Sequence, residues 1–189
     1  MTLLSIYFNN TSVKENYFMT FLELAKSRYS VRKFMDKPVE DEKLATILEA
    51  GKVAPTACNN QPQKIFVVKS AEMREKLRAV CKCTFGAPVI FVICYDETLS
   101  WKNRLMPGYQ SGETDAAIVC THMMLEAWEL GIGSCWVGMF NSDQVCQALG
   151  LPEGLCVSAL LPAGYPAEDA APLALHTTYR ADEEMFTVL

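Results

Sequence analysis

The sequence predicts an α+β or α/β sandwich built around one central sheet, and three observations support this fold class. Helical and strand-like patterns alternate along most of the 189 residues. The run Val89–Tyr95 is continuously apolar, which is typical of a strand buried on both faces. The segment Asp115–Leu130 has a helical pattern with apolar residues nearly all round, so we expect a central helix rather than a superficial one.

The first half of the chain carries the signals of three helices and one strand. Thr20 and Glu23 form a capping box, which marks the start of the first helix. Acidic residues open the second helix, and Gly51 suits its C-cap. Ser70 is the expected N-cap of the third. The expected helices are Thr20–Tyr29, Glu40–Ala50 and Ser70–Cys81, and the expected strand is Ile65–Val68.

The second half continues the pattern after the strand Val89–Tyr95. A polar connection over residues 96–114 leads to the long helix. Pro162 is expected to stop the last strand, because proline lacks the backbone N–H of a sheet ladder. Residues 167–189 form a polar tail without a core of its own. The remaining expected elements are the strand Ser134–Val137, the short helix Asn141–Leu149 and the strand Cys156–Leu161.

The domain is expected to span residues 19–189. A turn-like polar cluster over Asn9–Ser12 separates the beginning of the chain from the capping box. We interpret residues 1–18 as an N-terminal extension. A helix that packs on the body is the alternative for this segment.

Composition excludes several classes of protein. Half of the residues are apolar and 21% are charged, which is ordinary for a globular domain and unlike a disordered chain. The net charge of −5 includes no basic run, which argues against a nucleic-acid partner. The longest apolar run, Ala87–Cys94, is too short to cross a membrane. No signal peptide is evident, so we expect a cytoplasmic, reducing location.

Few residues offer acid–base, nucleophilic or metal chemistry. None of the eight cysteines forms a CxxC pair, so no zinc or iron–sulfur site is expected. The dinucleotide and P-loop glycine motifs are missing. His122 fits a hydrogen-bonded core histidine better than a catalytic one, and His176 lies in the tail. If the protein is an enzyme, the difficult chemistry therefore belongs to a cofactor.

Three segments carry positive signals, each with a plainer alternative. Arg28, Ser30 and Arg32 could clamp a phosphate if the first helix continues and turns both arginines to one side, or they could be exposed to solvent. The loop Ala54–Pro62 carries amide side chains suited to the edge of a heterocycle, or it is an ordinary loop. Gly131–Phe140 is a glycine-flanked strand whose end at Gly138 allows a planar ligand to approach the backbone, or a plain core strand.

Taken in this order, the three segments closely resemble the nitroreductase family of FMN-dependent oxidoreductases. The stretch Leu161–Pro166 and the lone Arg180 add two further matches, and the resemblance covers about residues 19–184. It implies an α/β/α sandwich with a mostly antiparallel central sheet, and a homodimer with FMN at the subunit interface. It also implies a ping-pong reaction, in which NAD(P)H reduces FMN and a small electron-poor acceptor, such as a nitroaromatic or a quinone, is reduced afterwards.

The resemblance also implies the roles of individual residues. Arg28, Ser30, Arg32 and Arg180 would hold the phosphate end of FMN. Pro55, Thr56, Asn59 and Gln61 would reach the flavin from the partner subunit. Trp136, Val137, Gly138 and Met139 would lie against the ring, with backbone N–H groups directed at N5. Lys82 would stand near the N1–O2 edge, although a solvated lysine at a helix end is an equal alternative. No side chain is assigned as a catalytic acid.

This sequence departs from the family pattern at several positions. Gln63 stands where many relatives have tryptophan, Gly138 where some have an acidic residue, and Thr178 where some have a second basic residue. The connection 96–114 replaces a longer helical lid. The alternatives left open are another flavin reaction (enone reduction, dehydrogenation or flavin breakdown), a non-catalytic flavin-binding module, and a domain without a cofactor.

Overall fold

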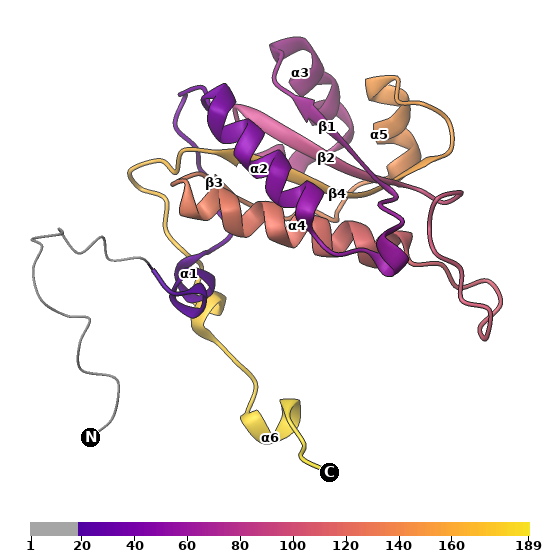
Figure 1. The fold of residues 1–189 in the computed structure, drawn as a ribbon. Coiled ribbons are helices and arrows are strands. Elements are labelled where there is room, and N and C mark those ends of the chain that lie inside the picture. Colours follow the sequence, from indigo (N-terminus) through magenta and orange to yellow (C-terminus); the bar gives the residue numbers. More distant parts are fainter. Residues whose placement is uncertain (1–18) are drawn as a thin grey trace, which may run out of the picture.

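The computed structural model describes residues 19–189 and shows three layers, a sheet with helices on both faces (Figure 1). The expected extension over residues 1–18 lies outside the described residues. The helices are α1 (Phe21–Ser27), α2 (Asp41–Val53), α3 (Ala71–Val80), α4 (Gly112–Glu129), α5 (Ser142–Leu149) and α6 (Asp182–Met185). Single turns of 3-10 helix are η1 (Ala57–Asn59), η2 (Lys82–Thr84) and η3 (Ala174–Thr177).

The four strands form one antiparallel sheet in the order β1-β2-β4-β3. The strands are β1 (Gln63–Val68), β2 (Val89–Asp96), β3 (Gly133–Ser134) and β4 (Leu155–Gly164). Successive residues of β2 enter two different cores: Phe91 and Ile93 pack with α2 and α4, whereas Ile90 and Val92 pack with α3 and α5. The expected α/β/α sandwich, with a central strand buried on both faces, is confirmed.

Local capping signals are confirmed at the starts of α1 and α3. The Thr20 hydroxyl accepts a hydrogen bond from the Glu23 N–H, and the Ser70 hydroxyl accepts one from the Met73 N–H. The expected end of α2 at Gly51 is wrong, because the helix continues to Val53. A Cβ atom at position 51 would lie 3.0 Å from Met123 Sδ, so glycine at this position allows α2 and α4 to approach closely.

The expected end of the last strand at Pro162 is also wrong, because β4 continues to Gly164. The Pro162 carbonyl accepts a hydrogen bond from the Cys135 N–H (3.1 Å), but proline has no N–H with which to return it. Two residues further along, Val137 and Leu160 exchange both bonds (2.9 and 3.0 Å). Pro162 therefore interrupts the backbone pairing of the expected strand Ser134–Val137 with β4, and β3 covers only Gly133–Ser134.

The tail leaves β4, passes beside α1 and ends in α6, which stands away from the body (Figure 1). Its first part is tied to the body: the Ala167 N–H donates to the Lys33 carbonyl (3.0 Å), and the Tyr29 hydroxyl donates to the Ala170 carbonyl (3.3 Å). Within residues 19–189, no helix has the length and apolar character that crossing a membrane requires.

Candidate functional site

The segment Arg28–Arg32 is extended, so the first helix ends before the expected Tyr29 and does not continue to Arg32. Helix α1 ends at Ser27, and Arg28 already has extended dihedral angles (φ −66°, ψ 131°). Ser30 forms a parallel bridge with Ser134, and the Val31 N–H donates to the Ser134 carbonyl (2.9 Å). Because side chains alternate along an extended chain, Arg28, Ser30 and Arg32 share one side while Val31 is buried. Every second side chain of an extended segment faces the same way, and this alternation brings the three side chains together.

These residues line a cavity of about 230 Å³ at the edge of the molecule. The lining is Arg28, Tyr29, Ser30, Arg32, Leu173, Leu175 and His176. Among the described residues, neither the Arg28 nor the Arg32 guanidinium is paired with a carboxylate, whereas the neighbouring Lys33 is paired with Asp169 (2.5 Å). Two unpaired guanidinium groups and a hydroxyl beside a cavity form a site suited to an anion such as a phosphate.

Gly138 and Met139 follow the interrupted strand, near the arginine segment, and expose backbone N–H donors. Met139 is 72% exposed, and a Cβ atom at Gly138 would meet no atom within 4 Å. The N–H groups of Gly138 and Met139 donate no hydrogen bond to any residue that the structure describes. Trp136 is half-buried, but the Val137 side chain belongs to the core beneath the sheet. The Val137 N–H is already bonded to the Leu160 carbonyl, so Val137 offers a ligand neither its side chain nor a free backbone donor.

Lys82 is exposed and belongs to η2, on the same side of the sheet edge as Met139. The Cys81 thiol beside it contacts the Met139 carbonyl oxygen (3.7 Å). Burial raises the pKa of the Cys135 thiol, and the nearby positive charge of Arg32 opposes this shift. The pairing of Ser30 and Val31 with Ser134 places the arginine segment directly against the strand that leads to Gly138.

The loop over residues 54–62 contains η1 and has strained backbone. Cys58, Asn59 and Gln61 have positive φ angles of 53°, 55° and 51°. Each such non-glycine residue costs about 1–2 kcal/mol, and less for asparagine. The Thr56 hydroxyl accepts a hydrogen bond from the Gln61 N–H (3.0 Å), and Asp115 Oδ1 accepts one from the Ala57 N–H (2.9 Å). Pro55, Asn59 and Gln61 are exposed on this loop, and Thr56 is half-buried.

On one chain the loop and the arginine segment lie at opposite ends of α4. The loop contacts α4 at Asp115, whereas the Trp128 Nε1–H donates to Ser27 beside the arginine segment (2.8 Å). At about 1.5 Å per residue, these two contact points are about 20 Å apart along the helix. Figure 1 shows α1 near one end of α4 and the projecting connection 96–114 at the other. The predicted site residues therefore form two separate groups.

Arg180 joins neither group within the chain. Its Nε pairs with Glu184 (3.0 Å) on the tail, and it does not line the cavity of Arg28 and Arg32. His176, which was expected only as a tail residue, does line that cavity, and its ring meets the Tyr29 ring edge-on at 6.2 Å. Asp115 is the second functional candidate that sequence reasoning missed, because no local pattern connects it with a loop some sixty residues earlier.

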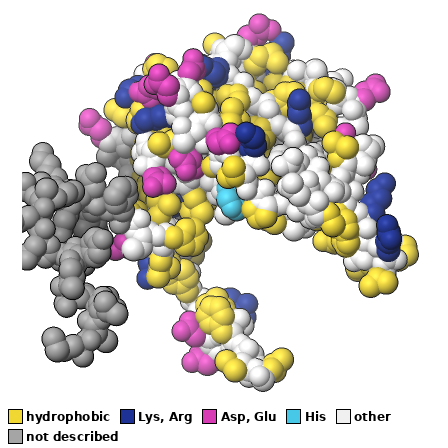
Figure 2. Space-filling view, in the orientation of Figure 1, with side chains coloured by type: hydrophobic (Ala, Val, Ile, Leu, Met, Phe, Trp, Pro, Cys, Tyr) yellow, Lys and Arg dark blue, Asp and Glu magenta, His cyan; other side chains and the backbone are white. Residues whose placement is uncertain are grey.

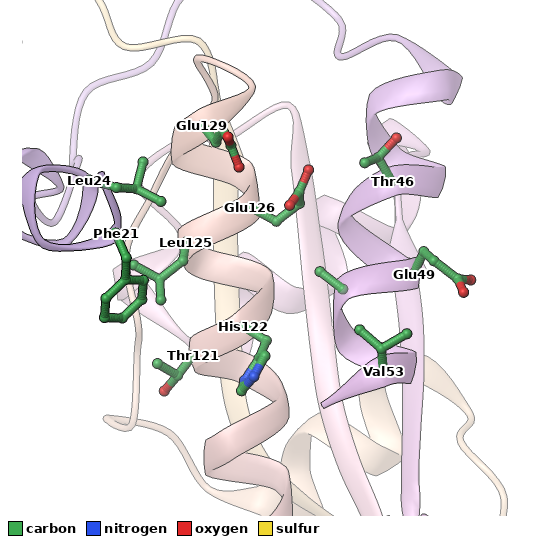
Figure 3. A pocket seen from close by; sticks show the side chains of 11 residues that line it. Phe21, Leu24, Thr46, Glu49, Val53, Thr121, His122, Leu125, Glu126 and Glu129 are labelled. Atoms are coloured by element: carbon green, nitrogen blue, oxygen red, sulfur yellow. The ribbon is translucent and has the colours of Figure 1, made fainter. Parts of the chain in front are cut away.

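The exposed side of α4 borders an apolar groove between α1, α2 and α4. Figure 3 shows Phe21, Leu24, Val53 and Leu125 around it, with His122 and Glu126 on α4. Figure 2 shows a histidine side chain at the surface of this face of the molecule, with apolar side chains nearby. His122 is only half-buried, so its expected place in the core is wrong, although its Nδ1 does lie 2.9 Å from the Ile118 carbonyl oxygen. The apolar residues that surround α4 on all sides thus include some on a face that residues 19–189 leave uncovered.

Comparisons with known proteins identify relatives over most of the chain. The model of the nitroreductase family matches residues 25–85 and 81–165. A "Putative NADH dehydrogenase/NAD(P)H nitroreductase" of Methanothermobacter thermautotrophicus is 31% identical over 158 residues, which cover 80% of this chain and 80% of the relative.

Solved structures agree with this result. A nitroreductase family protein from Clostridium difficile 630 is 36% identical with a TM-score of 0.83, covering 89% of this chain and 98% of the other. A "putative nitroreductase in complex with fmn" from Desulfovibrio desulfuricans is 28% identical with a TM-score of 0.74, covering 89% of this chain and 95% of the other.

Proposed function

The chain belongs to the nitroreductase family, and from this we propose that it is an FMN-dependent NAD(P)H oxidoreductase. The observation that carries the proposal is a cavity with two arginines that pair with no carboxylate within residues 19–189, next to a strand end whose backbone N–H groups bond to none of these residues. Its relatives include proteins named for NAD(P)H nitroreductase activity and one described in complex with FMN.

The residues present fit FMN in charge and shape. Arg28, Ser30 and Arg32 offer guanidinium and hydroxyl donors to the phosphate, and His176 adds an imidazole to the same cavity. The open backbone at Gly138 and Met139 offers N–H donors to a flat ring and leaves room for it. Lys82 would add a positive charge near the ring. Arg180 would reach the phosphate only through a different placement of the tail.

Bound FMN would supply two-electron redox chemistry, taking electrons from NAD(P)H and passing them to a small electron-poor acceptor in a ping-pong sequence. The chain's own groups orient the cofactor and stabilise negative charge. The described part of the candidate site includes no obvious side-chain acid, so we propose that solvent supplies the proton to the acceptor.

We propose that the complete site belongs to a homodimer. Within one chain, the arginine segment and the loop 54–62 contact α4 at points about 20 Å apart along the helix. At this separation, the two segments of one chain cannot bind the phosphate and the ring edge of the same flavin in the way that the family resemblance implies. A two-fold pairing of α4 helices that run in opposite directions would bring the start of one helix near the end of the other. Burial of the apolar groove lined by Phe21, Val53 and Leu125 would favour such a pairing.

A reducing, cytoplasmic location remains part of the proposal. All eight cysteines are free thiols, including the exposed Cys58, as a reducing compartment would keep them. The acceptor would be planar and electron-poor, of the nitroaromatic or quinone class, as the family resemblance implies, and the open space beside Gly138 is compatible with a planar molecule.

The experiment is an anaerobic titration of the purified protein. FMN is added first, and binding is followed by its absorption and by the quenching of its fluorescence. NADH or NADPH is then added, and bleaching of the bound flavin is expected with at least one of them, followed by recovery of the oxidised spectrum when an acceptor is added. A flavin that stays oxidised with both donors would favour another flavin reaction. Reduction without turnover of any acceptor would favour a binding module, and failure to take up FMN would refute the proposal.

A further inference from the structure

We propose that Asp115 is a positioning residue, which holds the loop 54–62 in the shape that serves the flavin site of the partner subunit. This inference rests on the proposed function and extends it to a residue outside the predicted site. Asp115 touches neither the arginine cavity nor the exposed strand end on its own chain.

Asp115 is a buried carboxylate whose hydrogen bonds point toward the loop and the start of α4. It is 2% exposed. Its Oδ1 accepts a hydrogen bond from the Ala57 N–H (2.9 Å), and its Oδ2 accepts one from the Ser111 hydroxyl (2.6 Å). A buried polar side chain is costly unless its atoms are hydrogen-bonded, so the Ala57 N–H stabilises the buried Asp115 side chain, which in turn holds the loop.

The start of α4 is a rigid support for this carboxylate. A Cβ atom at Gly112 would lie 2.2 Å from the Tyr95 ring, so the helix start is packed tightly against β2. The Ser111 hydroxyl, which donates to Asp115, also accepts a hydrogen bond from the Trp101 N–H (3.2 Å). Asp115 therefore joins the loop 54–62 and the base of the connection 96–114 to the same helix end.

The loop needs an external support because its own backbone is unfavourable. Cys58, Asn59 and Gln61 all have positive φ angles, which residues other than glycine rarely adopt. The bond from Ala57 to Asp115 connects this turn directly with α4, at the first residue of η1. Without this bond we expect the turn to relax, and the exposed Asn59 and Gln61 side chains would lose their fixed direction.

The test compares three variants with wild type. Asp115→Leu has a similar shape and removes both acceptors, so we expect FMN affinity to fall about tenfold. Asp115→Asn keeps an oxygen for the Ala57 N–H and should restore affinity to within about threefold of wild type.

Ala57→Pro removes the hydrogen-bond donor from the loop without changing the core. The backbone can accept this proline, because Thr56 before it is already extended (φ −130°, ψ 158°), the conformation that a residue before proline favours. Ala57→Pro should reproduce the effect of Asp115→Leu even if that variant does not fold.

Ser70→Ala is the matched control, because it removes a side-chain acceptor from a backbone N–H at the start of α3, on the other face of the sheet. We expect it to leave FMN affinity unchanged. Hydrogen exchange of the loop 54–62 is measured in parallel: it should speed up in Asp115→Leu and Ala57→Pro and stay slow in Asp115→Asn. This readout does not depend on FMN, so it tests the support of the loop even if wild type binds no flavin and the proposed function fails.

A mixed dimer tests whether the loop acts across the interface. One subunit carries Asp115→Leu and the other carries Arg28→Ala with Arg32→Ala, each with a different affinity tag. If the loop serves the partner, one of the two sites has both defects and the other has none, so the mixed dimer should bind about one FMN with wild-type affinity. Two weakened sites would overturn the action in trans. Unchanged loop exchange and unchanged FMN affinity in both Asp115→Leu and Ala57→Pro would overturn the role of Asp115 altogether.

Discussion

The arginine segment and the loop 54–62 are held in their places by different means. Val31 fixes the arginine segment through backbone pairing with Ser134 and through its own burial, and neither Arg28 nor Arg32 is paired with a carboxylate in the described part of the chain. The loop has strained backbone and depends on the buried side chain of Asp115. The first region is thus ready within one chain. The second is shaped by α4 and, in the proposed dimer, is used by the partner subunit.

The largest expected effect concerns the arginine region. The double variant Arg28→Ala/Arg32→Ala loses two charge-assisted contacts to one phosphate, worth on the order of 1.5–3 kcal/mol each. FMN affinity, measured by fluorescence titration, should fall at least a hundredfold, while thermal stability changes little because neither guanidinium is paired with a carboxylate in the described structure. Arg78→Ala is the control, since Arg78 pairs with Glu75 on α3. An unchanged affinity in the double variant would remove the phosphate site from the proposal.

The next effect tests whether the two regions need a second chain. Leu125→Glu places a charge in the apolar groove on α4 and should weaken association by about 2 kcal/mol or more if the groove is covered. Sedimentation should show a shift toward monomer, together with a loss of FMN. Met35→Glu, at an exposed apolar residue outside the groove, serves as control. A Leu125→Glu monomer that binds FMN as tightly as wild type would mean that one chain holds the whole site.

A smaller effect concerns the open strand end. Gly138→Ala adds a methyl group that meets no atom of the described chain, so the melting temperature should stay within about 1 °C of wild type. The same methyl group would stand where the flat ring is expected, so turnover or FMN affinity should fall severalfold. Loss of stability without loss of function would contradict the assignment of this surface to a ligand.

The smallest effect concerns Glu126, which lies on α4 between the two regions. Burial, and then the neighbouring charge of Glu129, raise the pKa of Glu126 above its ordinary value of 4.5. The folded protein therefore binds this proton more tightly than the unfolded chain, and stability falls as pH rises through the raised pKa. Glu126→Gln should raise the melting temperature slightly at pH 7, by less than about 2 °C, and leave it unchanged near pH 4. Thermal melts across this range would show whether the difference grows with pH.

The sequence was sufficient where the signals are local. The hydroxyls of Thr20 and Ser70 cap their helices because the N–H groups that they bind lie only three residues away. The continuous apolar run of Val89–Tyr95 predicts a strand buried on both faces because its side chains alternate between two layers. The ordered set of three motifs was enough to indicate the family, since each motif is contiguous in the chain.

The remaining features depend on residues that are distant in the sequence. Arg28 and Arg32 share a side because Ser134 draws their segment into an extended conformation, not because a helix continues. Pro162 can lie within a strand because its carbonyl oxygen accepts the hydrogen bond from the Cys135 N–H, and this bond does not require an N–H on the proline. The link from Asp115 to Ala57 was not predictable, because no local pattern connects a carboxylate with a backbone N–H that lies fifty-eight residues earlier. Helix caps and alternation are encoded over a few residues, whereas these contacts exist only after the sheet and α4 have brought separate segments together.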